Sequence, residues 1–364
     1  MYILWLTSPN HELELVILNK SVTDDKNMEL GALNWILNHE RIVHRDKEFY
    51  VKNSDYFGFY PRLGGDFFAR DFQNYDSLMI ASLVNHSDLL FLVDNYGVYT
   101  HDYQVDLNKP TRLMYGGFKQ SDLAVLREFR RQKKLIIGEF SLFPPPTSRS
   151  VRDSLQSILG LEWSGWTGRY FLSLDSTAHD DLPPWVIDLY HQKYGPEWPF
   201  FDSGIVLVRW DDIVILEYGT HLTSEAPVIR TQAVSAAKYD LPPAIQYPFW
   251  FDIVSSPVRD NQVISIYHLE VNEKGDSLLS THGIPKMFPA VLKESTQEYP
   301  FYYFAGDFSD NPVSPFSAYF KGIERFQKFF YNEKNVEDRQ QFFWSFYRPL
   351  ISSILQNEIE KPNR

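Results

Sequence analysis

The chain has 364 residues and a net charge of −12 at pH 7, from 47 acidic and 35 basic side chains. A surface this acidic argues against nucleic-acid binding, which needs clustered cations. No cysteine occurs, which excludes disulfides, thiolate metal sites and a cysteine nucleophile. The hydrophobic fraction of 44% allows a sizeable core, in one large domain or two ordinary ones.

Aromatic residues make up 16% of the chain, and this content has two interpretations. It fits an aromatic-rich core, and it also fits a groove that stacks sugar rings or other flat ligands. Composition alone leaves both interpretations open.

The first six residues, MYILWL, are apolar but far shorter than the roughly 20 residues of a membrane-spanning helix. They also lack the basic leader and the cleavage site of a signal peptide. We therefore expect a cytoplasmic protein from the sequence as written, and an envelope-associated protein if an anchor precedes Met1.

Three apolar stretches predict buried strands that alternate with helices. They are residues 12–18, 88–94 and 135–137, and each is followed by polar residues. A strand–helix–strand order implies right-handed crossovers, and therefore a parallel sheet.

Helices are expected between and after these strands. The first follows Asp24, and a second covers about 71–83. Ser121 is the predicted N-cap of a third helix. The C-terminal half of this helix is basic, and we expect it to be exposed to solvent. A fourth helix starts at Ser150 and ends at Gly160.

Two aromatic segments are predicted to be loops. Residues 49–61 are expected to overhang the strand ends. Residues 163–170 hold two tryptophans, two glycines and Arg169. This second loop either forms a packed turn or faces a ligand, in which case Arg169 would meet an anion or a carboxylate.

Short β segments dominate from about residue 183 onward. Residues 204–208 and 213–216 predict a hairpin, and residues 288–292 and 301–308 predict the last pair of strands.

Aromatic residues at helical spacing beyond Pro315 predict two helices, over about 316–331 and 336–358. We therefore divide the chain into an α/β core, a β-rich part that completes the core or is inserted in it, and a C-terminal helical tail. These parts cover residues 10–180, 181–310 and 311–364.

Polar residues close the predicted strands, at the edge where open α/β sheets bind ligands. Asn19 and Lys20 follow the first strand, Asp94 ends the second and Glu139 follows the third. Two carboxylates at neighbouring strand ends can act as acid and base, or hold a divalent cation. They can equally cap the next helices, or pair with Lys20 and Arg169.

Asp307 and Asp310 end the last predicted strand in the same way, although Gly306-Asp307 is also a common turn pairing. The ten histidines are scattered, without HExxH, HxxxH or HxH spacing, so we predict no metal site. No GxGxxG or P-loop motif occurs, so we predict no nucleotide cofactor.

Three segments resemble the class I glutamine amidotransferase-like superfamily. They are ELELVIL, the stretch from YGGF to SDLAVLREFRRQKKLIIGEF, and FPAVLKESTQEYPFYYFAGDFSD. The similarity is to non-catalytic branches, such as β-galactosidase trimerisation and trehalose-utilisation-like domains. It covers about residues 10–310 and implies a flavodoxin-like open parallel sheet, with a β-rich insertion and a C-terminal helical tail.

The resemblance also implies a Cys–His–Glu triad, and here the sequence departs from the family. The nucleophile position falls near Glu139 or Phe140, and no cysteine is present. Ser141 could act only with a histidine base held by a carboxylate, for which His268 and His282 are candidates by number alone. No GxSxG elbow surrounds Ser141.

Three functions follow from these observations. The first is a non-enzymatic amidotransferase-like domain with a binding or assembly role in cell-envelope or carbohydrate-related processes. The second is a hydrolase of glycans or esters that uses Asp94 and Glu139. The third is a membrane-tethered accessory protein whose anchor precedes Met1.

We favour the first function because the nucleophile is missing. Its expected partners are a carbohydrate or small-molecule ligand, and a protein that contacts the C-terminal helices. The predicted ligand-binding residues are Asn19, Lys20, Asp94, Tyr96, Glu139, Trp166 and Arg169.

Overall fold

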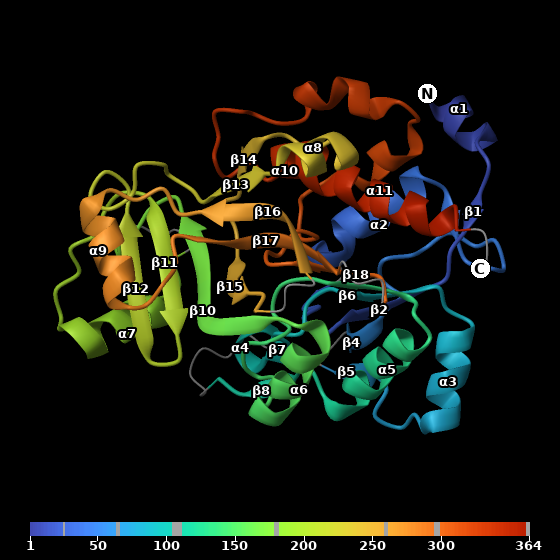
Figure 1. The fold of residues 1–364 in the computed structure, drawn as a ribbon, viewed down its shortest axis with the longest axis horizontal. Helices are drawn as coiled ribbons and strands as arrows, with labels where there is room; N and C mark the ends of the chain where they lie inside the picture. Colours follow the sequence, from blue (N-terminus) through green and yellow to red (C-terminus); the bar gives the residue numbers. More distant parts are fainter. Residues whose placement is uncertain are drawn as a thin grey trace.

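A computed structural model describes residues 1–24, 26–62, 66–103, 111–177, 182–257, 261–294 and 299–361. A ten-stranded sheet crosses the molecule, with helices on both faces (Figure 1). Its strands, in spatial order, are β14 (Ala244–Gln246), β13 (Val228–Thr231), β16 (Asn261–His268), β17 (Met287–Glu294), β18 (Phe301–Phe304), β9 (Leu135–Gly138), β6 (Leu89–Leu92), β2 (Leu15–Asn19), β4 (Phe57–Pro61) and β5 (Phe67–Arg70).

The centre of this sheet is parallel. Strands β4, β2, β6, β9 and β18 pair in parallel, while β5 and the strands beyond β18 are antiparallel. Numbered along the chain, the parallel strands lie in the order 2-1-3-4-5, which is the flavodoxin-like order. The predicted α/β class with an open parallel sheet is therefore confirmed, and the strand order reverses between β2 and β6.

Helices cover this parallel centre on both sides, which explains why its strands are apolar runs rather than alternating patterns. One face carries α2 (Gly31–His39), α8 (Ala233–Tyr239) and α11 (Arg348–Ile359). The other face carries α3 (Ser77–Asn85), α5 (Gln120–Arg131) and α6 (Arg149–Leu159), as Figure 1 shows.

Two predicted helix starts are wrong by two residues. The N-cap of α5 is Lys119, whose N–H donates to the Asp122 carboxylate at 2.7 Å, so Ser121 lies inside the helix. The N-cap of α6 is Ser148 instead of Ser150. The predicted end of α6 at Gly160 is confirmed, because this residue has φ +63° and closes the helix.

A second, four-stranded sheet contains the predicted hairpin. Its strands, in spatial order, are β12 (Asp212–Glu217), β11 (Gly204–Arg209), β10 (Glu162–Phe171) and β15 (Phe251–Ser255). Helices α7 (Pro184–Tyr194) and α9 (Glu273–Thr281) flank it (Figure 1). The hairpin of β11 and β12 is confirmed by its antiparallel register.

The prediction that residues 163–170 form a loop is wrong, because they belong to β10. The glycines of this segment suggested a turn, but Gly168 instead allows β10 to pack closely against the neighbouring strand. A Cβ atom at Gly168 would lie 2.3 Å from the Phe251 ring on the neighbouring strand. A glycine in a strand often marks such a close approach.

The prediction that residues 49–61 form a loop is also wrong in its second half, which is β4. Gly58 allows β4 to approach β2. It has φ +149°, and a Cβ atom there would lie 1.6 Å from the Asn19 carbonyl oxygen.

The C-terminal tail differs from the two predicted helices. Its first part forms 3₁₀ turns, η2 (Pro315–Tyr319) and η3 (Ile323–Phe329), with Gly322 at φ +84° between them. Its second part passes from α10 (Gln340–Phe342) through the π-turn η4 (Phe343–Tyr347) into α11. The apolar stripe predicted there is buried against the rest of the chain: Phe342, Phe346, Leu350 and Ile354.

The three-part division of the chain stays a prediction, although strands from residues 228–304 continue the central sheet. The remaining short elements are α1 (Tyr2–Thr7), β1 (His11–Glu12), η1 (Met28–Leu30), β3 (Ile42–Val43), β7 (Val98–Tyr99), α4 (Thr100–Tyr103) and β8 (Leu113–Tyr115).

We predict that Gly58→Ala destabilises the protein by about 3 kcal/mol or more, because the added methyl group meets backbone that cannot move without breaking the β2–β4 pairing. Gly283→Ala is the control, since it also has a positive φ but no atom within 4 Å of the added Cβ. Its cost should be about 1 kcal/mol. Equal urea midpoints for the two variants would contradict the close approach of β4 and β2.

Candidate functional site

The candidate site lies at the carboxyl edge of the parallel strands, where the strand order reverses. The chain leaving β2 is joined to the chain leaving β6 by a 2.8 Å hydrogen bond from the Lys20 N–H to the Asp94 carbonyl. The Asp94 side chain accepts the Tyr96 N–H at 2.7 Å. Asn19 and Asn95 are fully buried beside these residues.

Burial raises the pKa of Asp94 above its usual value, and the charge of Asp310 adds to this rise. Hydrogen bonds from the Tyr96 N–H and from the hydroxyls of Ser21 and Ser141 oppose it. Asp94 is 8% exposed, so it is almost entirely buried.

Lys20 is fully buried and is paired with Asp122 instead of Asp94 or Glu139. Its ammonium donates to the Asp122 carboxylate and, at 2.9 Å, to the Gly117 carbonyl. Burial lowers the pKa of Lys20, while Asp122 raises it. This pair ties the end of β2 to the start of α5, which is a structural role.

Glu139 follows β9, which is the neighbour of β6 as the predicted pairing of Asp94 and Glu139 required. The side chain is fully buried. One oxygen accepts the Ser309 N–H at 3.0 Å and the other accepts the Tyr347 hydroxyl at 2.9 Å. Burial raises the pKa of Glu139 to about 8, and the nearby Asp94 charge contributes.

Asp252 is a buried carboxylate that the sequence prediction missed. It lies on β15 and accepts the Ser141 N–H at 3.1 Å and the Thr167 hydroxyl at 2.8 Å. Burial raises its pKa to about 7. An aspartate in the apolar run FWFDIV was the only signal in the sequence.

Ser141 has φ +66°, the left-handed region that a non-glycine residue rarely adopts. This strain is typical of a nucleophile turn, but the two candidate histidines have their contacts elsewhere. His282 lies 3.4 Å from Asp212, and His268 ends β16 opposite Val228. The structure therefore does not assemble the triad considered for Ser141.

Asp307 and Asp310 follow the last strand of the parallel group, β18, and are near enough to Asp94 to interact with it electrostatically. Burial raises the pKa of Asp307 well above its usual value, and the charges of Asp310, Asp94 and Glu139 raise it further. Arg339 acts in the opposite direction. We call Asp94, Glu139, Asp252, Asp307 and Asp310 the carboxylate cluster.

Two buried tyrosine hydroxyls lie near Asp307. The hydroxyls of Tyr247 and Tyr267 have no hydrogen-bond partner among the described residues. The charge of Asp307 raises the pKa of both side chains, after the larger effect of burial. Buried hydroxyls without partners are uncommon, and each calls for an explanation such as an absent ligand or water.

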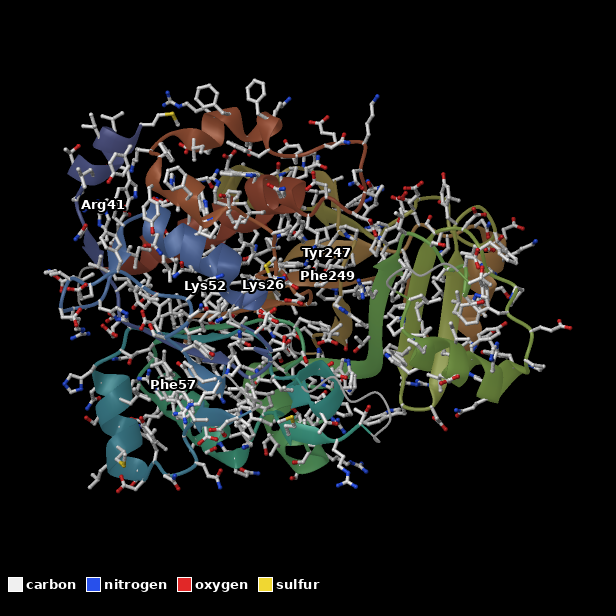
Figure 2. All side chains as sticks on the ribbon, turned by 180° about the vertical axis from the view of Figure 1, so that it is seen from behind. Lys26, Arg41, Lys52, Phe57, Tyr247 and Phe249 are labelled. Carbon is white, nitrogen blue, oxygen red and sulfur yellow. The ribbon has the colours of Figure 1, made fainter. Side chains whose placement is uncertain are left out.

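Arginines and aromatic rings lie beside the cluster. Arg339 is 3.4 Å from the Asp310 carboxylate, and its guanidinium lies 3.8 Å from the centre of the Phe249 ring. Arg169 lies 5.3 Å from the same ring and 5.5 Å from Trp250. Figure 2 shows Tyr247 and Phe249 next to each other beside β10.

The side chains of the other predicted ligand residues, Trp166 and Tyr96, lie apart from these contacts. Trp166 is buried in β10 with Arg209 over its ring at 4.5 Å. Tyr96 is 46% exposed and its ring is 5.0 Å from Tyr99. The structure thus brings Asp94 and Glu139 together and places Arg169 over aromatic rings instead of against a carboxylate of the cluster.

Among the described residues, no group of three or more Asp, Glu or His side chains has an arrangement that could hold a metal ion. An open hollow of about 610 Å³ lies at the C-terminal end of α5, lined by Arg127, Arg130, Arg131, Lys133, Ile158 and Tyr299. In a parallel sheet this end of a crossover helix lies away from the carboxyl edge of the strands, so the hollow is separate from the carboxylate cluster.

Comparison with known proteins gives structural neighbours only. No protein-family model and no curated protein matches the sequence. Similar structures include a ThuA-like protein from Bacteroides uniformis (9% identity, 83% of each chain, TM-score 0.36) and a glutamine amidotransferase from Thermotoga maritima (9%, 97% of this chain and 100% of that chain, 0.38). A carbohydrate deacetylase is also similar (6%, 82% of this chain and 30% of that chain, 0.34).

Two of these neighbours are of the kinds that the sequence resemblance named, while the non-catalytic branch stays a prediction. Because these sequence identities are at most 9% and the TM-scores are at most 0.38, any argument for a function has to come from this chain's own residues.

We predict that Lys20→Met costs about 3–5 kcal/mol, because it leaves the buried Asp122 carboxylate without its cation. Lys286→Met is the control: its partner Asp276 lies at 2.7 Å, but both side chains are about half exposed. That change should cost about 1 kcal/mol or less. A small loss for Lys20→Met in urea unfolding would contradict the structural role of Lys20.

We also predict that the protein loses stability as the pH rises from about 4.5 to about 8. The pKa of Glu139 is higher in the folded chain than in the unfolded chain, so folding favours the protonated form and is weakened as Glu139 ionises. Because one pKa unit corresponds to about 1.4 kcal/mol, the loss should be at least that large.

Glu139→Gln should remove much of this pH dependence, because the amide retains an oxygen for the Ser309 N–H and stays neutral. The measurement is the free energy of unfolding against pH for the wild type, for Glu139→Gln and for the exposed control Glu333→Gln. Parallel curves for all three proteins would show that Glu139 is already ionised in the fold.

Proposed function

We propose that this chain binds a hydroxyl-rich ligand of the carbohydrate class at the carboxylate cluster, without the amide chemistry of an amidotransferase. The observation that carries the proposal is Asp307, which is 8% exposed and lies near two buried tyrosine hydroxyls without partners. The hydroxyls of a bound sugar would satisfy these groups.

The surroundings of Asp307 favour a neutral ligand. Burial raises the pKa of Glu139 and of Asp307 and so favours their neutral forms, and Arg339 is paired with Asp310, so the cluster offers hydrogen-bonding groups with little unpaired charge. Phe249 and Trp250 are partly buried, and aromatic rings of this kind pack against the C–H face of a sugar where a ring face is not already covered by Arg339 or Arg169. This combination of hydrogen-bonding groups and aromatic faces fits a saccharide better than a purely apolar or an ionic molecule.

The supposed biological setting, a carbohydrate-related or cell-envelope process, is part of the same proposal and has its support in the sequence resemblance. An assembly role would use a protein partner, and the buried tail stripe leaves less of the C-terminal helices for it than we expected.

A second candidate function is a carboxylate-dependent hydrolase acting on glycans or esters. The raised pKa of Asp307 favours it, because a raised pKa favours the protonated form, which can donate a proton to a leaving group. Both Glu139 oxygens are occupied by Ser309 and Tyr347, so Asp307 replaces Glu139 as the acid in this mechanism, with Asp94 as the base.

The test is a thermal-shift screen with mono- and oligosaccharides, followed by calorimetry on any hit. We expect at least one sugar that stabilises the wild type. Its Kd should be at least tenfold higher for Asp307→Asn and for Asp94→Asn than for the wild type. Asp153→Asn is the control, because Asp153 is 61% exposed on α6.

Three results are informative. Equal binding by the wild type and both cluster variants would place the site elsewhere and overturn the proposal, as would the absence of any saccharide hit. Release of a sugar or an acyl group by the wild type, lost in Asp307→Asn, would establish the hydrolase instead.

A further inference from the structure

Two segments from opposite ends of the chain expose large apolar side chains on one surface. In α1, Ile3 is 73% exposed and Leu4 is 61% exposed; in the η2–η3 segment, Phe316 is 70% exposed and Phe329 is 85% exposed. We call this set the α1–η surface. Its apolar members are Met1, Tyr2, Ile3, Leu4, Leu6, Phe316, Phe326 and Phe329.

Aromatic contacts join α1 to the η2 part of this surface. The Tyr2 ring lies 6.2 Å from Phe320, and Phe320 lies 5.2 Å from Phe316. Trp5 and Tyr319 meet edge to face at 4.9 Å beneath them. Figure 1 shows α1 and the η2–η3 segment, drawn in orange-red above α11, along the same outer edge of the molecule.

The α1 helix is fixed to the body of the protein rather than hanging free. Trp5 is buried, and its indole N–H donates to the Asn38 carbonyl at 3.0 Å. The Arg41 guanidinium lies over the indole at 4.6 Å, and Figure 2 labels this arginine beside α1. The helix therefore holds its other apolar side chains outward in water, at a cost in free energy.

Cations accompany these apolar side chains, although the whole chain carries −12. Lys321, Arg325 and Lys328 are exposed in the η2–η3 segment. With three residues per turn in a 3₁₀ helix, Phe326 and Phe329 share one side of η3, and Arg325 and Lys328 share the adjacent side.

The acid of the same turn, Glu324, is directed away from these cations and pairs with His39 at 3.6 Å. The exposed face of η3 is therefore cationic and aromatic.

We infer that the α1–η surface docks on an anionic lipid surface. Aliphatic and aromatic side chains enter the boundary between headgroups and acyl chains, while nearby lysines and arginines contact anionic headgroups. A second copy of this chain is a poorer occupant, since each copy carries −12. No helix among the described residues is long and apolar enough to cross a bilayer, so the docking proposed here is peripheral.

The experiment is flotation of the full chain with vesicles of phosphatidylcholine alone, and with vesicles that also contain phosphatidylglycerol. We expect binding to the anionic vesicles, weakened by salt. Changing Lys321, Arg325 and Lys328 to Glu should reduce the affinity by roughly fivefold or more per cation changed. Ile3→Asp with Phe329→Ser should abolish binding, while Val234→Asp, at an equally exposed apolar site on α8, should leave it unchanged.

Other outcomes would overturn the inference. They are failure of the wild type to float with anionic vesicles, equal flotation of the surface variants and the wild type, or a wild-type dimer in light scattering that Ile3→Asp makes monomeric. Circular dichroism and unfolding midpoints show whether each variant is folded. None of these results depends on the sugar-binding proposal, because Asp307→Asn should float like the wild type.

Discussion

The carboxyl edge of the parallel strands is held together by hydrogen bonds to buried carboxylates. Glu139 joins the end of β9 to the Ser309 N–H and to the Tyr347 hydroxyl, and so connects three segments that are far apart in the sequence. Asp252 does the same for Ser141, Thr167 and Tyr303. Because a buried carboxylate without partners would be very unfavourable, these bonds specify how β9, β15 and the tail meet.

This arrangement places several acidic groups in one region of low polarity. Burial raises the pKa of Glu139 and of Asp307, and the charge of Asp94 raises both further. Glu139 and Asp252 have most of their hydrogen-bonding capacity used by the protein, so we regard them as structural. Asp94 lies at the reversal of the strand order and Asp307 follows β18; both are slightly exposed, so we regard them as the groups that a ligand would reach.

The ligand site and the α1–η surface are independent features. One consists of polar groups at the strand ends, and the other of apolar side chains fixed in water by Trp5 and its contacts. A chain with both could hold a hydroxyl-rich ligand close to a lipid surface. These two proposals rest on separate observations.

The amino-acid pattern was sufficient to predict the parallel strands. An apolar run indicates a strand that is buried on both faces, and the polar residue after it marks the end of that strand. This pattern therefore indicated Asp94 and Glu139 as neighbours. The pattern was insufficient to predict β4 and β10, because their glycines suggest turns. In the structure, Gly58 of β4 allows a close approach to Asn19, and Gly168 of β10 allows a close approach to Phe251. Likewise, the pattern could not distinguish continuous helices from the 3₁₀ turns of the tail.

Long-range pairing was decided by the tertiary structure alone. Lys20 pairs with Asp122, which lies 102 residues later, and Asp252 comes to Ser141 from a strand 111 residues away. No local spacing encodes such contacts, because they depend on which buried polar groups have to satisfy one another once the sheet is assembled. The sequence by itself determined the α/β class, the strand ends and the absence of a cysteine nucleophile; the packed fold decided which carboxylates are held by hydrogen bonds within the protein and which are slightly exposed.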